Sequence, residues 1–340
     1  MVNKSLNEVM STWKKKDLES PLVSIECITY NHEKYIADTL DGFFMQVTDF
    51  PFEVIVHDDA STDKTADIIR EYEVKYPGII KPIYEDENQY SKHNGALERI
   101  INAQLKGKYI AICEGDDYWI DSLKLQKQVN LLEAHPDYGM CYGRAQVFSE
   151  KFGQLTNNIW GSQNNGIIDL LTKQVVGIPT LTICFRKEIF DEYIQNVDPS
   201  KKGWLLGDYP LTLWFALKSR IFFMNEILAV YRDIPNSASH QQQKEKMESF
   251  VDSIFSIKLF FVNKYNIKVD LISLNDSKYR RLLSYALELQ DRKYASKIIN
   301  KIKHKRKREY LYKVIFSSNL LFIIYKLYRG YKKNKSLSGK

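Results

Sequence analysis

The sequence contains none of the glycine-rich loops that hold phosphates in two large classes of enzyme. No GxGxxG segment follows its first apolar run, and no GxxxxGK segment followed by Ser or Thr occurs anywhere. Dinucleotide-dependent redox enzymes and P-loop phosphoryl transferases bind their phosphates on these loops, so the absence argues against both classes. The segments HExxH and GxSxG are missing too, which removes the signatures of zinc proteases and α/β-hydrolases.

Cysteine is scarce and widely spaced. The four cysteines, Cys27, Cys113, Cys141 and Cys184, form no CxxC pair, and no histidine lies near them at the spacing of a metal site. We interpret them as small core residues in a reducing cytoplasm. Residues 1–20 lack the apolar run of a secretory signal, so we expect a cytoplasmic protein.

Positive charge is concentrated at one end of the chain. The 340 residues carry 49 Lys and Arg against 42 Asp and Glu, a net charge of +7. Residues 301–340 hold thirteen of the basic residues and one acid, Glu309, which leaves 36 basic and 41 acidic residues in 1–300. The chain is long enough for a large catalytic domain with an appendage, and its basic character belongs to the C-terminal segment.

The first 135 residues alternate between apolar β-branched runs and amphipathic stretches, which is typical of βαβ units that feed a parallel sheet. Beyond them the pattern is mixed and includes a polar loop at 156–166, and residues 237–300 have a helical pattern without proline or glycine. We expect an α/β fold with a helical extension. The expected strands are 22–28, 52–57, 79–84, 109–113, 138–148, 181–185 and 221–231, and the expected helices are 33–47, 63–75, 94–106, 121–134 and 208–218.

Acidic residues follow two of the expected strands. Strand 52–57 runs into Asp58 and Asp59, and strand 109–113 runs into Glu114, Asp116 and Asp117. Ligands of parallel α/β sheets bind beyond the carboxyl ends of the strands. Carboxylates gathered there repel one another unless a cation or ligand offsets the charge, and Mg²⁺ or Mn²⁺ commonly bridges such carboxylates to substrate phosphates. The competing interpretation is that these acids cap the helices that follow.

Four segments in the right order resemble glycosyltransferase family 2, which has the Rossmann-like GT-A fold. They are Val23 to Asn31 with its Thr-Tyr-Asn turn, Val54 to Asp63, Gly107 to Asp117, and the pair Glu87 to Lys92 and Glu114 to Trp119, which is similar to a bacterial subgroup associated with surface-polysaccharide assembly. The resemblance covers about 21–235. It implies an N-terminal extension (1–20), a GT-A catalytic domain (21–235) with a nucleotide-binding half (21–117) and an acceptor half (118–235), and a helical region (236–340).

The resemblance also implies roles for individual residues. Tyr30 would stack on the nucleobase, Asp59 would accept a hydrogen bond from its imide, and Lys92, or less favourably His93, would lie near the nucleotide. Asp116 would contact the ribose and the metal ion, Mn²⁺ or Mg²⁺, and Asp117 would ligate that ion. The full set that the resemblance places at the nucleotide is Ile28, Tyr30, Asn31, Asp58, Asp59, Lys92 and Asp116. Two departures from the family pattern, Ile28 in place of proline and Ala60 in place of glycine, affect only the turns.

Transfer with inversion needs one base to accept the proton of the acceptor hydroxyl. We assign this role to Asp208, which follows Gly207 at the start of an expected helix; the alternative is a plain helix cap. Trp119 and Trp204 are candidates for sugar platforms, with the core as the alternative, and Thr180 belongs to a stretch that resembles the loop lining the acceptor cleft. His240 is a candidate metal ligand on a closing loop, and an exposed histidine is the alternative.

Residues 309–335 combine about a dozen mainly apolar positions, at 314–325, with basic residues on both sides. This run is shorter than the ~20 residues that span a bilayer. A helix lying on the inner face of the cell membrane fits better; a homodimer helix is the alternative, and nucleic acid is not expected because no nucleic-acid-binding fold accompanies it.

Taken together, these features predict an inverting, metal-dependent glycosyltransferase. The donor would be a nucleotide sugar, with a UDP-sugar favoured, and the acceptor a saccharide or lipid-linked saccharide. The alternatives are a sugar-phosphate nucleotidylyltransferase and a non-catalytic nucleotide-sugar-binding scaffold. The former requires a glycine-rich phosphate loop after the first strand, and residues 29–32 do not supply one.

Overall fold

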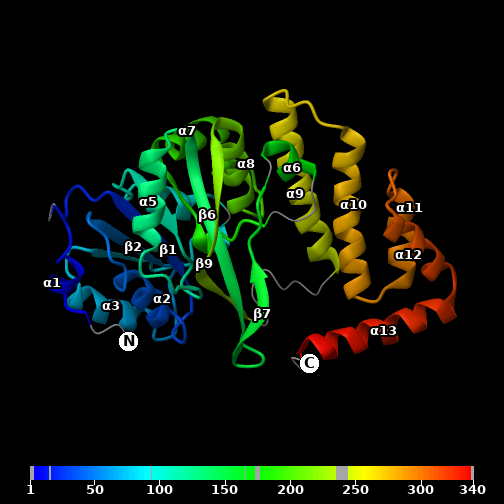
Figure 1. Ribbon diagram of the computed structural model, residues 1–340, viewed down its shortest axis with the longest axis horizontal. Coiled ribbons are helices and arrows are strands. Elements are labelled where there is room, and N and C mark those ends of the chain that lie inside the picture. The colour runs from blue at the N-terminus through cyan, green and yellow to red at the C-terminus, as the bar shows by residue number, and fades with distance from the viewer. Residues whose placement is uncertain are drawn as a thin grey trace. The chain divides into compact units, whose positions relative to one another are not determined.

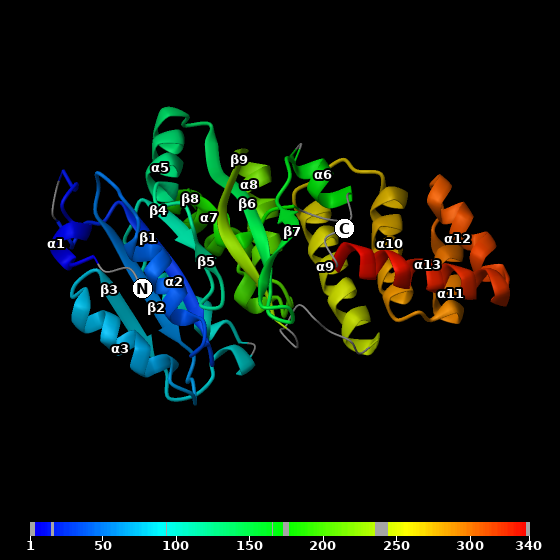
Figure 2. The same ribbon diagram turned by 60° about the horizontal axis from the view of Figure 1, so that its bottom comes forward.

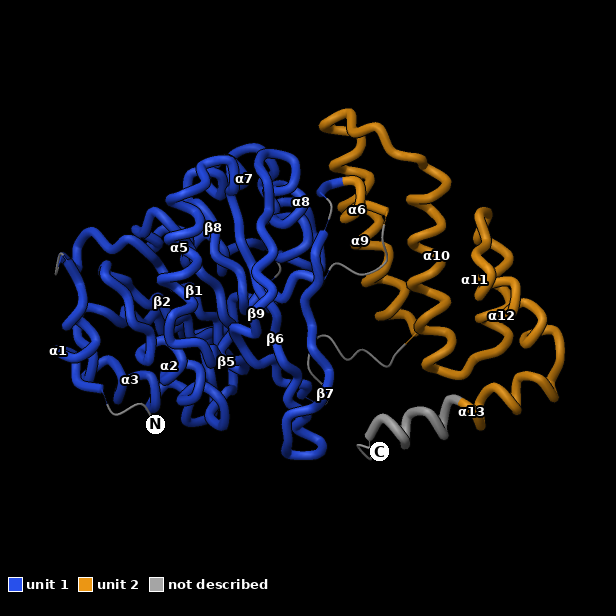
Figure 3. Tube along the Cα trace, in the orientation of Figure 1, with its two compact units in different colours: residues 1–167, 176–235 blue, residues 168–175, 236–340 orange. Residues whose placement is uncertain are grey.

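The computed structural model describes residues 4–14, 17–92, 94–164, 166–172, 177–234 and 244–337, with the backbone alone for 329–337. The chain divides into two compact units (Figure 3). The first comprises residues 1–167 and 176–235, and the second comprises 168–175 and 236–340. The sequence did not predict that 168–175 would leave the first unit.

One nine-stranded sheet forms the framework of the first unit, counted over the described residues (Figure 1). Its order is β3-β2-β1-β4-β8-β6-β9-β5, and β7 pairs with β6. Strands β3, β2, β1 and β4 run parallel, β8 is antiparallel to both of its neighbours, and β6 and β9 are parallel. The bounds are β1 Val23–Thr29, β2 Phe52–Asp58, β3 Ile80–Tyr84, β4 Tyr109–Ile112, β5 Tyr118–Trp119, β6 Tyr138–Ser149, β7 Gln154–Trp160, β8 Cys184–Arg186 and β9 Arg220–Asp233.

Side chains alternate between the two faces of the sheet, as the two-residue period of a strand requires. In β1, Val23, Ile25 and Cys27 point into the main hydrophobic core, whereas Glu26 and Ile28 are half-buried on the opposite face. The core side is covered by helices whose apolar residues join that cluster (Figures 1 and 2). These helices are α1 Leu6–Val9, α2 Ile36–Phe44, α3 Thr65–Lys75 and α5 Lys124–Ala134.

Other helices pack on the strands of the C-terminal half of the sheet. α7 contacts β8, and α8 contacts β6 and β9. The Phe185 ring of β8 lies 5.5 Å from the ring of Phe190 in α7 and 5.1 Å from that of Phe215 in α8. The bounds are α4 Ala96–Asn102, α7 Lys187–Val197 and α8 Asp208–Lys218, and short 3₁₀ turns occur at Tyr90–Lys92, Thr180–Thr182 and Pro199–Lys201.

The second unit is helical in its described residues. Asp270 caps α10 by accepting hydrogen bonds from the amides of Ile272 and Ser273, and Asp291 caps α11 through the Tyr294 amide. The bounds are α6 Ile167–Thr172, α9 Lys244–Lys264, α10 Leu271–Glu288, α11 Arg292–Lys301, α12 Lys307–Ser317 and α13 Asn319–Leu337. None of the described helices combines the length and apolarity needed to cross a bilayer.

The mixed α/β sheet with flanking helices and C-terminal helices confirms the predicted fold class. One local prediction was partly wrong. The polar stretch 156–166 was expected to be a loop, yet its first residues belong to β7, which pairs with β6. Most β7 side chains are exposed, so the pairing depends on backbone hydrogen bonds rather than on an apolar pattern that a sequence displays. All four cysteines are buried free thiols, as predicted.

Candidate active site

The carboxyl ends of β1, β2 and β4 bring the predicted motifs to one edge of the sheet. β1 pairs with β2 so that Thr29 lies opposite Asp58, and with β4 so that Glu26 lies opposite Ile112. The amide of Asp59 donates to the Thr29 carbonyl at 3.0 Å. The turn after β1 therefore lies beside the turns that carry the acidic residues.

Asn31 joins the first two turns. Its amide donates to the Ser61 hydroxyl at 2.8 Å, and its side-chain oxygen accepts a hydrogen bond from the Thr62 amide at 2.8 Å. Asn31 has a φ of 55° and Ala60 a φ of 62°, so both lie in the left-handed region. Glycine would fit position 60 without strain, whereas an L-residue in the left-handed region costs ~1–2 kcal/mol.

Tyr30 and Asp58 lie at this edge with different exposure. The Tyr30 side chain is 44% exposed, as an aromatic platform for a base requires. Ile28 is half-buried on the strand before it. Asp58 is buried and accepts a short hydrogen bond from the Ser61 hydroxyl, and burial raises its pKa above the usual range.

Asp59 has a structural task in addition to the role that the resemblance implies. One carboxylate oxygen accepts the Gln89 amide at 2.6 Å and the other accepts the Tyr90 amide at 3.0 Å. The residue is buried, so Asp59 fixes the loop at 85–92 against the end of β2. Its contact with a nucleobase stays a prediction.

Lys92 ends the loop that Asp59 holds. Its ammonium group donates to Glu87 at 2.6 Å and to the side-chain oxygen of Gln89 at 3.1 Å. A nucleotide phosphate would have to share the Lys92 ammonium group with these partners. His93, the less favoured basic residue, and His240 lie outside the described residues.

The turn at Gly115 to Asp117 presses closely on the end of β1. A Cβ atom at Gly115 would lie 2.6 Å from the Thr29 hydroxyl oxygen, so this position requires glycine. The Thr39 hydroxyl of α2 lies within hydrogen-bonding distance of the carbonyls of Gly115 and Asp117, at 3.1 Å and 2.6 Å. These contacts set the direction in which the two aspartates leave the backbone.

Asp117 is buried, and Arg232 at the end of β9 holds it in place. The Arg232 amide donates to one Asp117 carboxylate oxygen at 2.7 Å, and the Arg232 guanidinium donates to the Asp116 carbonyl at 2.8 Å. Burial, with the charges of Asp116 and Glu114, raises the pKa of Asp117 well above its usual range, and Arg232 opposes the shift. The Asp117 anion therefore gains from any cation placed beside it.

The Arg232 guanidinium is itself fixed on several sides. It lies 5.1 Å from the Tyr35 ring centre and 4.4 Å from the Tyr118 ring centre, and it forms an ion pair with Asp38 of α2. This network links β9 to the turn at Gly115 to Asp117. Its hydrogen bond between Arg232 and Asp117 joins residues that are 115 positions apart in the sequence. Sequence reasoning missed Arg232, because nothing local at that position signals the contact.

Asp116 and Asp117 suit a divalent cation that shares its ligands with a substrate. Magnesium-type ions take carboxylate oxygens together with phosphates and water, and one or two protein carboxylates are enough. The Asp116 side chain forms no hydrogen bond or ion pair among the described residues, while Asp117 has one oxygen that accepts no described hydrogen bond. In the described part of the chain, no group of three or more His, Cys, Asp and Glu side chains is arranged to hold an ion by itself.

A second set of carboxyl groups lies on the sheet face that β1 and β4 share. Glu26 of β1 lies opposite Ile112 of β4, and Glu114 comes two residues after Ile112 in the chain. Burial and the charge of Glu98 raise the pKa of Glu26 to about 7. Burial and the charges of Asp116, Asp208 and Glu26 raise the pKa of Glu114 to about 8.

Glu26 and Glu114 are therefore poised to be protonated near neutral pH. Within the described ranges, the Glu26 side chain forms no hydrogen bond or ion pair, the Glu114 side chain is hydrogen-bonded to its own backbone, and no basic residue contributes to either pKa shift. The Tyr193 hydroxyl of α7 is also buried without a hydrogen-bond partner, and the charges of Asp208 and Glu98 act on it. Glu114 was among the carboxylates predicted at the strand ends, whereas nothing local in the sequence marks Glu26 or Tyr193, because a sequence pattern does not show which side chains lack a partner.

Asp208 is the first residue of α8, and its charge acts on Glu114. Its side chain is in contact with solvent, yet surrounding protein atoms raise its pKa by desolvation. One oxygen accepts the Tyr209 amide at 2.8 Å, and the other accepts the Thr180 hydroxyl at 3.3 Å. The structure thus brings the predicted base and the predicted acceptor-loop threonine together.

The two tryptophans differ in position. Trp119 is 1% exposed, its ring lies 4.8 Å from that of Phe43, and its indole N–H donates to the Leu181 carbonyl at 2.7 Å. Trp119 is therefore a core residue, and its buried ring does not offer an exposed platform for a sugar. Trp204 is half-buried in the segment before α8, where it stays a candidate.

Comparison with known proteins agrees with this arrangement. The sequence model described as "Glycosyl transferase family 2" matches residues 24–194, half of the chain. A protein of Mycobacterium tuberculosis, Rv1520, is 37% identical over 214 residues, and the match covers 62% of this chain and 58% of that protein's length. The putative teichuronic acid biosynthesis glycosyltransferase TuaG of Bacillus subtilis is 29% identical over 69% of this chain and 86% of its own length.

Two solved structures share the fold. Residues 1–349 of Staphylococcus aureus TarS, in complex with UDP-GlcNAc, give a TM-score of 0.54 at 17% identity over 83% of this chain and 81% of that one. The mannosyltransferase PcManGT of Pyrobaculum calidifontis, in complex with GDP-Man and Mn²⁺, gives 0.54 at 16% identity over 95% and 94%.

Proposed function

Because the chain belongs to glycosyltransferase family 2, we propose that it moves a sugar, with inversion, from a nucleotide-sugar donor to a hydroxyl of a saccharide or lipid-linked saccharide. A UDP-sugar is the favoured donor. The observation that carries the proposal is that the ends of β1, β2 and β4 meet at one edge of the sheet, where the Asp59 amide donates to the Thr29 carbonyl and the Gly115 amide donates to the Ile28 carbonyl. The charges of Asp116 and Asp208 both act on Glu114, which supports a single site for the donor and the base.

The nucleotide would bind along the turns after β1 and β2. Tyr30 offers an exposed ring for the base, Asn31 sets the shape of the turn, and Asp58 and Asp59 define its floor. Asp116 reaches the ribose side, and Lys92 supplies positive charge near the nucleotide. Ile28 supplies an apolar side chain just before the turn after β1.

Asp116 and Asp117 would hold Mn²⁺ or Mg²⁺ together with the diphosphate of the donor. When bound, the ion offsets the negative charge of the departing nucleoside diphosphate. The protein's own contribution is to hold Asp117 rigidly through Arg232 and to leave the Asp116 carboxylate available.

Asp208 would accept the proton of the acceptor hydroxyl as that oxygen attacks the anomeric carbon. Its raised pKa makes it a stronger base than an ordinary aspartate, and the Thr180 hydroxyl orients one of its oxygens. Inversion follows from attack on the face opposite the leaving group. Glu26 and Glu114, protonated in part, can donate to or accept from the hydroxyls of a bound sugar.

The relatives support the finer parts of the proposal. UDP-GlcNAc in the TarS structure favours a UDP-sugar, and Mn²⁺ in the PcManGT structure favours a divalent ion. The name of TuaG favours a surface polysaccharide as product. We place the enzyme in the cytoplasm, peripheral to the inner face of the cell membrane; a homodimer remains the alternative use of 309–335.

The test is release of nucleoside diphosphate from a panel of UDP-, GDP- and dTDP-sugars with and without Mn²⁺ or Mg²⁺. Turnover should need the metal and should be abolished in Asp117→Ala, with Asp121→Ala as a control at an aspartate outside the site. Metal-dependent turnover of undiminished rate in Asp117→Ala would exclude this metal assignment. Nucleotide binding without turnover of any sugar would favour the scaffold alternative, and pyrophosphate release from a nucleoside triphosphate would favour the nucleotidylyltransferase.

A further inference from the structure

An apolar stripe on α13 has no covering partner among the described residues of the second unit. Leu320, Ile323, Ile324 and Leu327 recur at the spacing of one helix face, and all four are exposed, Leu320 at 66% and Leu327 at 70%. The other side of the same helix is the packed side. Phe322 and Tyr325 there lie 5.7 Å from the rings of Phe316 and Tyr312 of α12.

α12 carries a second exposed apolar group. Tyr310, Leu311 and Val314 are each more than half exposed, whereas Phe316 is buried in the cluster that joins α12 to α13. We call the two groups together the tail surface: Tyr310, Leu311 and Val314 of α12 with Leu320, Ile323, Ile324 and Leu327 of α13. Aromatic packing between α12 and α13 fixes the inner side of the tail surface. The exposed residues of its outer side therefore belong to folded helices and not to an unfolded segment.

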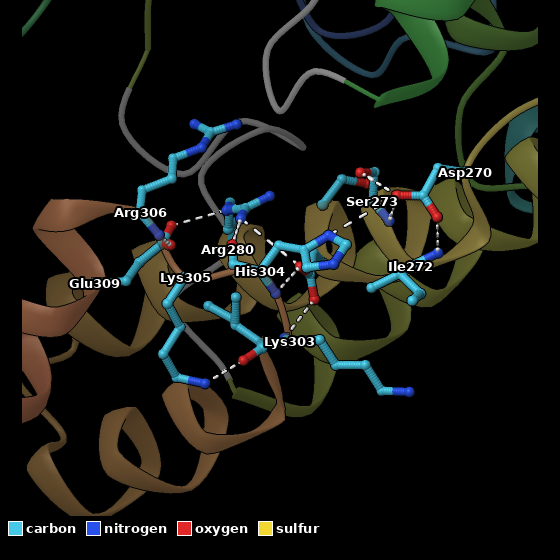
Figure 4. Close-up of polar contacts among 12 residues, drawn as sticks. Asp270, Ile272, Ser273, Arg280, Lys303, His304, Lys305, Arg306 and Glu309 are labelled. Carbon is cyan, nitrogen blue, oxygen red and sulfur yellow. Dashed lines mark hydrogen bonds and ion pairs between the residues drawn. The ribbon is translucent and has the colours of Figure 1, made fainter.

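The charge beside the tail surface is of one sign. Lys307, Arg308, Lys313 and Lys326 are exposed on the same two helices. The one acid of residues 301–340, Glu309, is buried and forms an ion pair with Arg280 at 2.8 Å (Figure 4). The thirteen basic residues of this segment therefore face no exposed carboxylate of their own segment.

One acid of the neighbouring helix α10, Asp276, also turns inward, whereas Glu288 at the end of that helix is exposed. Asp276 is fully buried and accepts hydrogen bonds from the amides of Lys303 and His304 at 2.8 Å and 2.7 Å, so the loop between α11 and α12 is held from within. The side chains of Lys303, His304 and Arg306 in that loop are exposed. The basic loop is thus an ordered feature of the unit.

Apolar exposure and single-sign charge together decide which occupant fits. A second copy would bring +12 of residues 301–340 against another +12, and exposed like charges oppose such a contact. A nucleic acid would answer the charge but not the apolar stripe. An anionic lipid surface answers both, since apolar side chains enter the acyl boundary and basic side chains meet the headgroups.

We propose that the tail surface binds the face of an anionic lipid bilayer, with α12 and α13 lying in the interface. The proposal rests on the membrane placement made under the proposed function and names the surface responsible, but it depends on the second unit alone and not on sugar transfer. It decides between the membrane and the homodimer as the partner of this segment.

The test is co-sedimentation of the full chain with vesicles of phosphatidylcholine alone and of phosphatidylcholine with phosphatidylglycerol. We expect binding to the anionic vesicles that weakens with salt, and little binding to the neutral ones. The double variant Ile323→Glu with Leu327→Glu should lose binding, and Lys313→Gln with Lys326→Gln should weaken it by roughly fivefold for each charge removed. Leu271→Glu, an exposed leucine of α10 at 59%, is the matched control and should bind like the wild type.

Equal binding of the double glutamate variant and the wild type would overturn the proposal, as would failure of the wild type to bind anionic vesicles. A dimer in sedimentation velocity that the glutamate variant dissociates would assign the surface to a second copy instead. Circular dichroism and the melting temperature verify that each variant is folded, and the exposed positions make this the expected result. Transfer to a soluble acceptor should be unchanged, which separates this outcome from failure of the proposed function.

Discussion

Protonation of Glu26 should control part of the stability of the first unit between weakly acidic and weakly alkaline pH. The side chain is half-buried on β1 and has no described hydrogen-bond or ion-pair partner. Burial is the main cause that raises its pKa from an ordinary 4.5 to about 7, and the charge of Glu98 adds to it. The substitution Glu26→Gln removes the charge and keeps the shape of the protonated side chain.

The sign follows from the two pKa values. Below pH 4.5 the carboxyl is protonated in both the folded and the unfolded chain, and its contribution to stability is fully present. As the pH rises through about 7, ionisation of Glu26 stabilises the unfolded chain more than the folded chain, in which burial opposes the charge. The contribution of Glu26 to the free energy of unfolding is therefore lost. The variant, which has no group to ionise at this position, does not lose it.

The magnitude comes from the same shift. The difference between 7 and 4.5 is 2.5 pKa units, and each unit corresponds to 1.36 kcal/mol, so the upper bound is about 3.4 kcal/mol. Because the carboxyl is partly in contact with water, screening reduces this to about 1–2 kcal/mol. We therefore expect Glu26→Gln to exceed the wild type by that amount at pH 8 and to equal it within about 0.5 kcal/mol at pH 5.

Urea unfolding of both proteins at the two pH values, without metal or nucleotide, measures this difference. Glu98→Gln is the control, because Glu98 is exposed and this substitution removes only the smaller cause of the shift; its difference from the wild type in free energy of unfolding should change far less between the two pH values. The reasoning is refuted if Glu26→Gln and the wild type keep the same difference in free energy of unfolding at pH 5 and pH 8. Glu114 is present in all three proteins, so its own titration cancels to first order.

Three further changes test other parts of the site. Asp208→Asn should retain nucleotide binding by calorimetry while kcat falls by about 10²–10⁴, because no carboxylate is left to accept the proton; undiminished transfer would exclude Asp208 as the base. Asp59→Asn keeps one acceptor oxygen and leaves one of two buried amides unpaired, at a cost of about 1–3 kcal/mol, so amide exchange at Gln89 or Tyr90 should quicken, and unchanged protection would contradict the role of Asp59. Ala60→Gly should raise the free energy of unfolding by about 0.5–1 kcal/mol, since φ is 62° there, and a loss of stability in thermal melts would count against that explanation.

Local order in the sequence was enough to place the acidic motifs at one edge. The run of β-branched residues before Asp58 and the run before Glu114 both form strands, and parallel pairing with β1 then brings their ends together. The residues with the clearest local signals, Asp116 and Asp117, follow directly from this.

Contacts between distant segments decided which of these side chains are engaged. Both carboxylate oxygens of Asp59 accept hydrogen bonds from amides that lie 30 and 31 positions away in the sequence. Asp117 accepts a hydrogen bond from the amide of Arg232, 115 positions away. Trp119 was predicted as a candidate sugar platform, but its ring packs against Phe43 and its indole N–H donates to the Leu181 carbonyl in the core. No local pattern encodes such pairings, since they depend on which strands become neighbours.

The sequence by itself determined the fold class and the basic character of the tail, because periodicity and composition within short windows carry them, and the motifs at its strand ends supplied the resemblance to the family. Only the tertiary structure decided that Glu26 and Tyr193 have no described hydrogen-bond partner, that the charge of Asp208 acts on Glu114 and Tyr193, and that α13 turns Phe322 inward and Leu320 outward. Burial and the absence of a partner are properties of surroundings assembled from many segments, and these surroundings exist only once the chain has folded.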